Sequence, residues 1–80
     1  MVTIKQIEWT ESKREHIISW QGILNGKIFF TIDRFKTDNA IMTSHVVPMK
    51  MRTNEDVEEL QETAQILTEA YINSLLDEKD

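Results

Sequence analysis

The chain has 80 residues and a formal net charge of −5 at pH 7, with 14 acidic against 9 basic residues. This length suits one small domain with a modest core, and we expect residues 1–80 to form a single unit. The sequence contains no cysteine, which excludes disulfides and thiolate metal sites, and no apolar run long enough to span a bilayer. We therefore expect a cytoplasmic protein with no membrane segment.

Charge is unevenly distributed along the sequence. Residues 1–52 carry eight Lys or Arg against five Asp or Glu, whereas residues 53–80 carry one Lys against nine Asp or Glu. Such polarity bears on partners and electrostatic steering rather than on fold. The simplest interpretation of the acidic run is a solvated helix face, because runs of like charge usually face solvent.

Alternating apolar and polar residues, many of them β-branched or aromatic, predict β-strands in the first part of the chain. We expect three or four antiparallel strands at about residues 2–9, 15–24, 27–35 and 40–47. Turn-forming residues separate them at 10–13 and 36–39. Pro48 cannot donate a backbone hydrogen bond to a ladder, so the last strand ends there or lies at a sheet edge.

Asn25-Gly26 is the strongest hairpin signal in the chain. A two-residue loop pairs Leu24 with Lys27, and the ladder that follows mixes apolar and polar residues on both faces. A three-residue loop with Gly26 in the left-handed region forms a G1 bulge, pairs Ile23 with Lys27 and segregates the faces. Because burial favours segregated faces, we predict the three-residue loop. Its inner face consists of Ile18, Trp20, Ile28, Phe30 and Ile32.

The last third of the chain has helical spacing. Apolar residues recur at three- and four-residue intervals, namely Val57, Leu60, Ala64, Leu67, Tyr71 and Leu75. Thr53 is a suitable N-cap, and Asp56 three residues later completes a short capping box. We therefore predict one α-helix over about residues 54–76, packed on one face of the sheet. Strands followed by a helix indicate an α+β fold built on an antiparallel β-meander.

Residues able to carry catalysis are scarce. His16 and His45 are the only candidates for a general base near neutral pH, and neither belongs to a pattern typical of a catalytic dyad. Two glycines cannot build a phosphate-binding loop, and no His-x-x-x-His spacing indicates a metal site. We expect no catalytic residue, metal or cofactor, and we rank a small enzyme or metal-binding protein below a binding protein.

Apolar residues on the outer sheet face indicate a contact surface. The predicted outer face carries Ile17, Ser19, Gln21, Ile23, Lys27, Phe29, Thr31 and Asp33. Ile23, Lys27 and Phe29 are the residues that we expect to touch a partner, because exposed apolar patches mark interaction sites. The expected partner is another protein, and stacking of two such faces in a homodimer is the alternative.

The acidic helix predicts a second contact surface. Glu58, Glu59 and Glu62 lie off the apolar stripe, and carboxylates along a helix can imitate a run of phosphates and occupy a basic surface. Small inhibitors carried by phages and other mobile elements often act in this manner, and immunity-type proteins show similar features. We therefore expect a non-catalytic regulatory protein that acts through protein–protein contacts.

Nucleic-acid binding is the alternative function. Lys27 and Thr31 would be joined on the open sheet face by further basic residues, namely Lys13, Arg14, Arg34 and Lys36. The surplus of positive charge in this half of the chain is small, and the acidic helix opposes an approach to phosphates. This alternative therefore ranks second.

Overall fold

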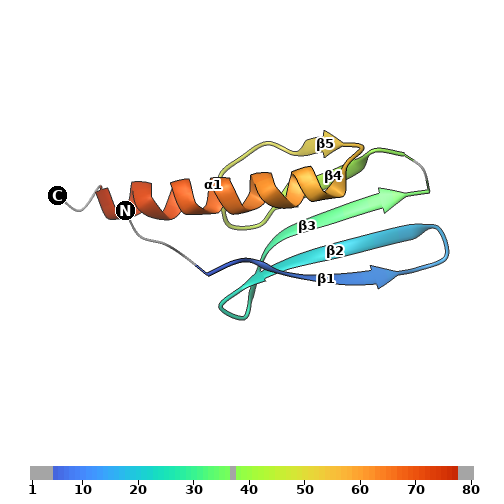
Figure 1. Ribbon diagram of the computed structural model, residues 1–80, viewed down its shortest axis with the longest axis horizontal. Coiled ribbons are helices and arrows are strands. Elements are labelled where there is room, and N and C mark those ends of the chain that lie inside the picture. The colour runs from blue at the N-terminus through green and yellow to red at the C-terminus, as the bar shows by residue number, and fades with distance from the viewer. Residues whose placement is uncertain (1–4, 37, 78–80) are drawn as a thin grey trace.

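The computed structural model describes residues 5–36 and 38–77, and within them the chain forms one antiparallel sheet and one C-terminal helix (Figure 1). The elements are β1 (Glu8–Lys13), β2 (Ile17–Leu24), β3 (Lys27–Phe35), β4 (Ala40–Ser44), β5 (Arg52–Asn54) and α1 (Val57–Asp77). The strands pair in sequence order, β1-β2-β3-β4-β5, which makes the sheet a meander. The predicted α+β fold is confirmed.

The strand boundaries differ from the prediction mainly at the two edges of the sheet. β2 and β3 lie close to the predicted ranges, but β1 runs through residues 10–13, where the sequence predicts a turn. Polar residues such as Thr10 and Ser12 suit this strand because β1 is an exposed edge strand. Residues 2–4 of the predicted first strand lie outside the described residues.

β4 ends at Ser44 instead of residue 47, because the chain turns there. The Ser44 hydroxyl donates a hydrogen bond to the carbonyl of Val47, and the backbone N–H of His45 bonds the carbonyl of Phe29 at 2.8 Å. The chain then returns as β5, which pairs with β4. Sequence analysis does not predict β5, because a strand of three residues is too short to show a period.

The β2–β3 hairpin closes through a two-residue turn. Asn25 and Gly26 both have positive φ, 53° and 76°, as a type I′ turn requires. Leu24 therefore pairs with Lys27. The predicted three-residue loop is wrong, because asparagine tolerates the left-handed region and lets the shorter turn form.

The bulge lies inside the strands rather than in the turn. Ile23 pairs with Ile28, but the next residue of β2, Gly22, pairs with Phe30. Phe29 is therefore an extra residue in β3, with no partner on β2. This shift of register separates the apolar face from the polar face, an effect that the sequence-based prediction attributed to a bulge in the turn.

The displaced bulge segregates the two faces of the sheet. Phe30 and Ile32 are fully buried on the inner face, together with Met42 of β4. Trp20 pairs with Ile32 and is half-buried. The predicted inner position of Trp20, Phe30 and Ile32 is confirmed, but Ile28 lies before the bulge, in a rung of the opposite face, and is 40% exposed.

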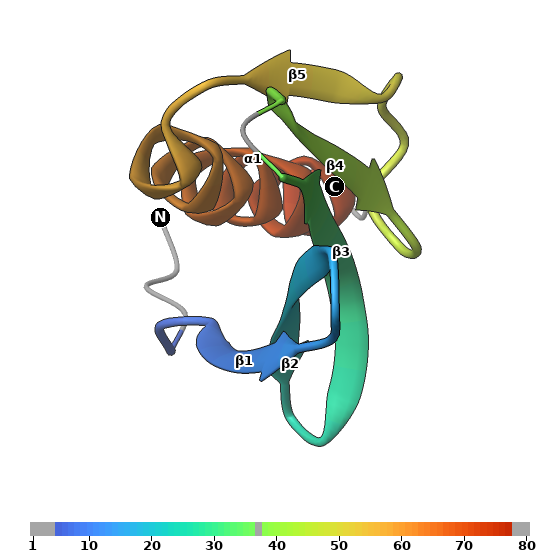
Figure 2. The same cartoon turned by 90° about the vertical axis from the view of Figure 1, so that its right-hand side faces the viewer.

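α1 packs against the inner face over β3 and β5, while β1 and β2 diverge from it (Figure 2). The helix contributes two residues to the core cluster, which consists of Ile7, Phe30, Ile32, Ala40, Met42, Val47, Leu60 and Ala64. The predicted apolar stripe is confirmed from Val57 to Tyr71. Leu75 is 43% exposed, because the helix extends beyond the sheet (Figure 1).

A threonine completes the buried side of α1. Thr68 is fully buried, and its hydroxyl donates a hydrogen bond to the carbonyl of Ala64 at 2.7 Å, which satisfies the polar group within the helix. Despite its length, α1 is too polar to cross a membrane, and the described residues contain no other helix.

Asp56, not Thr53, caps α1. Asp56 Oδ1 accepts the backbone N–H of Glu58 at 3.0 Å, and Asn54 Oδ1 accepts the backbone N–H of Asp56 at 2.8 Å. Thr53 lies in β5, where it pairs with Ile41. The predicted helix start at residue 54 is therefore too early, because β5 takes up the residues that the sequence analysis assigned to the cap.

A glutamine of the helix holds the segment that leads into β1. Gln65 Oε1 accepts the backbone N–H of Ile7 at 2.9 Å, and Gln65 Nε2 donates to the carbonyl of Lys5 at 3.3 Å. The side-chain amide thus pairs with an extended backbone much as a neighbouring strand would. This contact fixes the backbone beside Ile7, which is only 6% exposed.

Gly22 provides the space into which this segment packs. A Cβ at Gly22 would lie 2.8 Å from Cη2 of Trp9 and 2.9 Å from Cγ2 of Ile7. Trp9 pairs with Gly22 across the β1–β2 ladder, so its indole stands where a side chain of β2 would otherwise lie. The absence of a side chain at position 22 is therefore a packing requirement.

We expect Gly22→Ala to destabilise the fold by about 1–3 kcal/mol, the usual cost of overpacking a filled core. The added methyl must displace the stiff indole of Trp9 or the buried Ile7. Urea denaturation followed by circular dichroism measures the change, and Gln21→Ala, at an exposed position of the same strand, is the control. An unchanged midpoint for Gly22→Ala would contradict this close packing.

The observed cap, Asp56, and the predicted cap, Thr53, imply different effects of mutation on the free energy of unfolding. Asp56→Ala should lower the free energy of unfolding by about 1 kcal/mol, because α1 loses a capping oxygen. Thr53→Ala, at an exposed position of β5, should change it by less than about 0.5 kcal/mol. Urea denaturation of both variants measures the order of these effects, and the reverse order would show that Thr53 is the cap.

Candidate interaction surfaces

We call the side of the sheet turned away from α1 the outer face. Alternate residues of the strands point to it and form rungs across the sheet. From the β2–β3 turn to the opposite end, these rungs are Glu8, Ile23 and Ile28; Thr10, Gln21, Thr31 and Thr43; Ser12, Ser19, Asp33, Ile41 and Thr53; and Ile17 with Phe35. The middle of the outer face is therefore mainly polar, and its two ends are mainly apolar.

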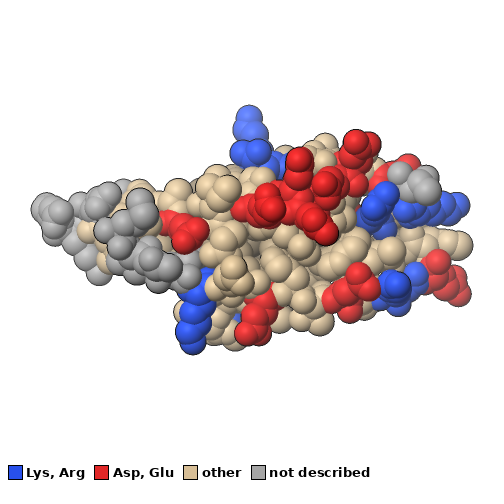
Figure 3. Space-filling view, in the orientation of Figure 1, with Lys and Arg blue, Asp and Glu red and all other residues tan. Residues whose placement is uncertain are grey.

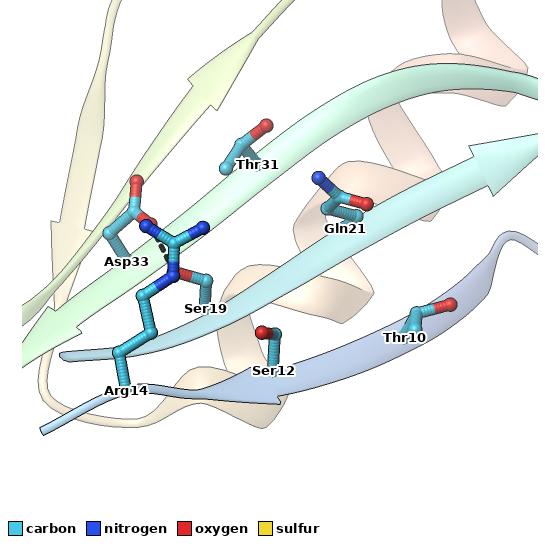
Figure 4. Close-up of a pocket in the computed structure, with 7 residues that line it drawn as sticks. All are labelled: Thr10, Ser12, Arg14, Ser19, Gln21, Thr31 and Asp33. Carbon is cyan, nitrogen blue, oxygen red and sulfur yellow. Dashed lines mark hydrogen bonds between the residues drawn. The ribbon is translucent and has the colours of Figure 1, made fainter.

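The two middle rungs line a shallow cavity of about 340 Å³. Its walls are formed by Thr10, Ser12, Arg14, Ser19, Gln21, Thr31 and Asp33 (Figure 4). The Ser19 hydroxyl donates to Asp33 Oδ1 at 2.7 Å, and Arg14 reaches toward these two side chains from beyond the end of β1 (Figure 4). The lining is dominated by hydroxyl and amide groups, so it offers both donors and acceptors of hydrogen bonds.

Exposed apolar residues lie at both ends of this polar band. At one end, Phe35 is 47% exposed and pairs with Ile17; Ile41 of β4 is 42% exposed but pairs with Asp33, so it lies within a middle rung. At the other end, Ile28 pairs with the half-buried Ile23. Sequence analysis places Ile17 and Ile23 on this face, but it does not single out Phe35 or Ile41, whose neighbours depend on the register of three strands.

The three sheet residues predicted to touch a partner lie in different surroundings. Ile23 belongs to the outer face. Lys27 is exposed beside the turn, but it pairs with the buried Leu24, in a rung of the inner side. Phe29 is half-buried and packs against the core cluster, so its predicted outward position is wrong. The cause is the bulge, which breaks the alternation at this residue.

The outward side of α1 is acidic (Figure 3). Glu58, Glu59 and Glu62, the helix residues predicted to touch a partner, are all exposed, and the half-buried Glu69 continues the run. Ile66 lies among them, four residues from Glu62 and three from Glu69, and is 64% exposed. Sequence analysis identifies the carboxylates but misses Ile66, whose only signal is its position off the apolar stripe.

No cation of the described chain pairs with this acidic surface. The one ion pair among residues 5–36 and 38–77 joins Lys13 Nζ to Glu11 Oε2 at 3.8 Å, near the far end of β1. Glu59 accepts a hydrogen bond from Asn54 Nδ2 at 2.9 Å, which leaves its charge in place. The charges of the helix carboxylates are therefore not compensated by an ion pair within the described residues.

The basic residues considered for nucleic-acid binding do not gather on the outer face. Arg14 lines the polar cavity. Lys13 and Arg34 both pair with Ile18, in a rung of the inner side, and Arg34 is half-buried there. Lys36 Nζ lies 5.4 Å from the ring centroid of Phe35. These positions form no continuous basic track of the kind that follows a phosphate backbone.

The two histidines make separate contacts. His45 Nε2 is 2.7 Å from Thr31 Oγ1, whereas the ring of His16 packs edge-on against Phe35 with centroids 6.2 Å apart. A hydroxyl–imidazole pair also needs a group that orients the imidazole before it can act as nucleophile and base. Within the described residues, no carboxylate is hydrogen-bonded to His45, and no three acidic or histidine side chains are grouped as metal ligands.

No protein-family model, no curated protein and no solved structure matches the chain. The outer face of the sheet is polar at its centre with few charges, whereas the outward side of α1 is acidic and contains one strongly exposed apolar residue.

Proposed function

We propose that this chain is a non-catalytic binding protein that docks on a basic protein surface through the outward side of α1. One observation carries the proposal. Ile66 is 64% exposed between Glu62 and Glu69, near the C-terminal end of a row of carboxylates that also includes Glu58 and Glu59.

An exposed apolar residue flanked by charged residues is the usual composition of a small recognition surface. An apolar side chain surrounded by polar groups can enter a pocket on a partner, while the surrounding groups set orientation and exclude water. Because the surrounding groups here are carboxylates, the complementary surface carries Lys or Arg around an apolar hollow. An acidic helix without an apolar centre would be explained by solvation alone.

The line of carboxylates along one side of the helix favours a partner that ordinarily binds nucleic acid. Glu58 to Glu69 spans about 16 Å at 1.5 Å per residue, so the four carboxylates are on average about 5.5 Å apart along the helix axis. One strand of a nucleic acid carries a phosphate per about 3.4 Å of its axis, so the helix presents a sparser row of charge of the same sign. The helix can therefore occupy a basic groove in place of a phosphate backbone, which would make the protein an inhibitor of the protein that it binds.

A site-specific cross-link tests this function. The chain has no cysteine, so Ile66→Cys creates a single position for a photoactivatable label. We expect the labelled variant to cross-link to a basic protein in a lysate of the source organism, and added duplex DNA should suppress the product. Lys27→Cys, labelled in the same way at an exposed position beside the β2–β3 turn, is the matched control and should give no such product.

The cross-linked protein then allows a quantitative comparison. Combined replacement of Glu58, Glu59 and Glu62 by Gln should weaken its binding by about tenfold or more and reduce the salt dependence. Combined replacement of Glu11, Glu15 and Asp38 by Gln, Gln and Asn removes the same charge elsewhere and should change binding little. Equal losses in the two variants, or cross-links that are insensitive to DNA, would contradict the proposal.

A further inference from the structure

The outer face has a pattern that matches a copy of itself. Its end rungs are apolar, with Ile23 and Ile28 at one end and Ile17 and Phe35 at the other, and its two middle rungs are mainly polar. When two such faces are stacked with their strands running in opposite directions, each apolar end lies over the apolar end of the other copy. The polar bands then coincide as well.

Two unpaired charges at opposite ends of β1 select one arrangement. Glu8 lies at the start of β1, with its side chain in the rung of Ile23, and Arg14 directly follows the end of β1. Both are exposed, and neither forms an ion pair within the described residues. A two-fold axis parallel to the sheets and perpendicular to the strands lays β1 over β1 with reversed direction. Glu8 of each copy then meets Arg14 of the other, so the interface contains two identical ion pairs.

The polar middle of the face suits the same two-fold axis. The axis brings each of the two middle rungs over the other, so that Thr31 of one copy lies opposite Asp33 of the second copy, and Gln21 lies opposite Ser19. Hydroxyl and amide groups both donate and accept hydrogen bonds, so these pairs can satisfy each other. A face of one dominant charge would instead repel its own copy.

The area is sufficient for a specific contact. Five strands about 4.8 Å apart, with an average of about six residues per strand at 3.3 Å, give a flat footprint of roughly 500 Å² per copy. Two copies therefore bury on the order of 1,000 Å², the lower bound for a specific interface. We propose that two copies of this chain form a symmetric dimer by stacking their outer faces, with Glu8 of each copy paired to Arg14 of the other. This proposal does not depend on the partner of α1.

A charge exchange tests the dimer and its axis together. Sedimentation equilibrium between about 5 and 500 µM should show the wild type approaching twice the monomer mass of 9.4 kDa. Arg14→Glu and Glu8→Arg should each raise the dissociation constant of the dimer by about tenfold or more, because each variant places like charges together twice. The double variant E8R/R14E should return to within about threefold of the wild type, because the pairs are restored in the opposite sense.

Glu62→Arg changes the charge by the same amount on α1 and should leave the dissociation constant unchanged, and circular dichroism confirms the fold of each variant. A wild type that stays at monomer mass over the whole range would overturn the proposal. So would a double variant no tighter than the single ones, or a Glu62→Arg variant that dissociates as they do.

Discussion

The shift of register at Phe29 is the constraint on which the rest of the structure depends. The turn at residues 25–26 fixes where the β2–β3 ladder begins, and an unbroken ladder from that turn would place Trp20 opposite Thr31. One extra residue in β3 places Trp20 opposite Ile32 instead, so the large apolar side chains collect beneath α1. The same step leaves threonine and serine on the other side, where they form the polar band of the outer face. Core and surface thus result from a single local irregularity.

The sequence predicts the fold class because its signals are long and redundant. The apolar stripe of α1 repeats from Val57 to Tyr71, and the alternation in β2 and β3 extends over whole strands. The sequence does not predict the position of the bulge, because a bulge in the turn and a bulge at Phe29 both separate the apolar face from the polar face. In the observed register Phe29 packs against the core cluster, a contact that no local sequence pattern reveals. β5 escapes prediction because it contains only three residues.

The candidate surfaces were predictable to different degrees for the same reason. The carboxylates of α1 follow from composition and helical period, whereas Ile66 was missed, because its only signal is its position off the apolar stripe. The apolar and polar rungs of the outer face depend on the pairing of several strands. The positions of Glu8 and Arg14 at opposite ends of this face are therefore defined only once the sheet has formed. The outward side of α1 and the outer face of the sheet lie on opposite sides of the fold (Figure 2). A dimer stacked through the outer faces would therefore present two acidic helices outward, and a partner with two basic sites would bind it with added avidity.

Cross-strand proton contacts measured by NMR test the central claim most directly, because the register at Phe29 decides which side chains form the core and which form the outer face. The account predicts contacts of Gly22 with Phe30 and of Trp20 with Ile32. Contacts between Trp20 and Phe30 would indicate a bulge in the turn, and contacts between Trp20 and Thr31 would indicate an unbroken ladder. Either result would contradict the account.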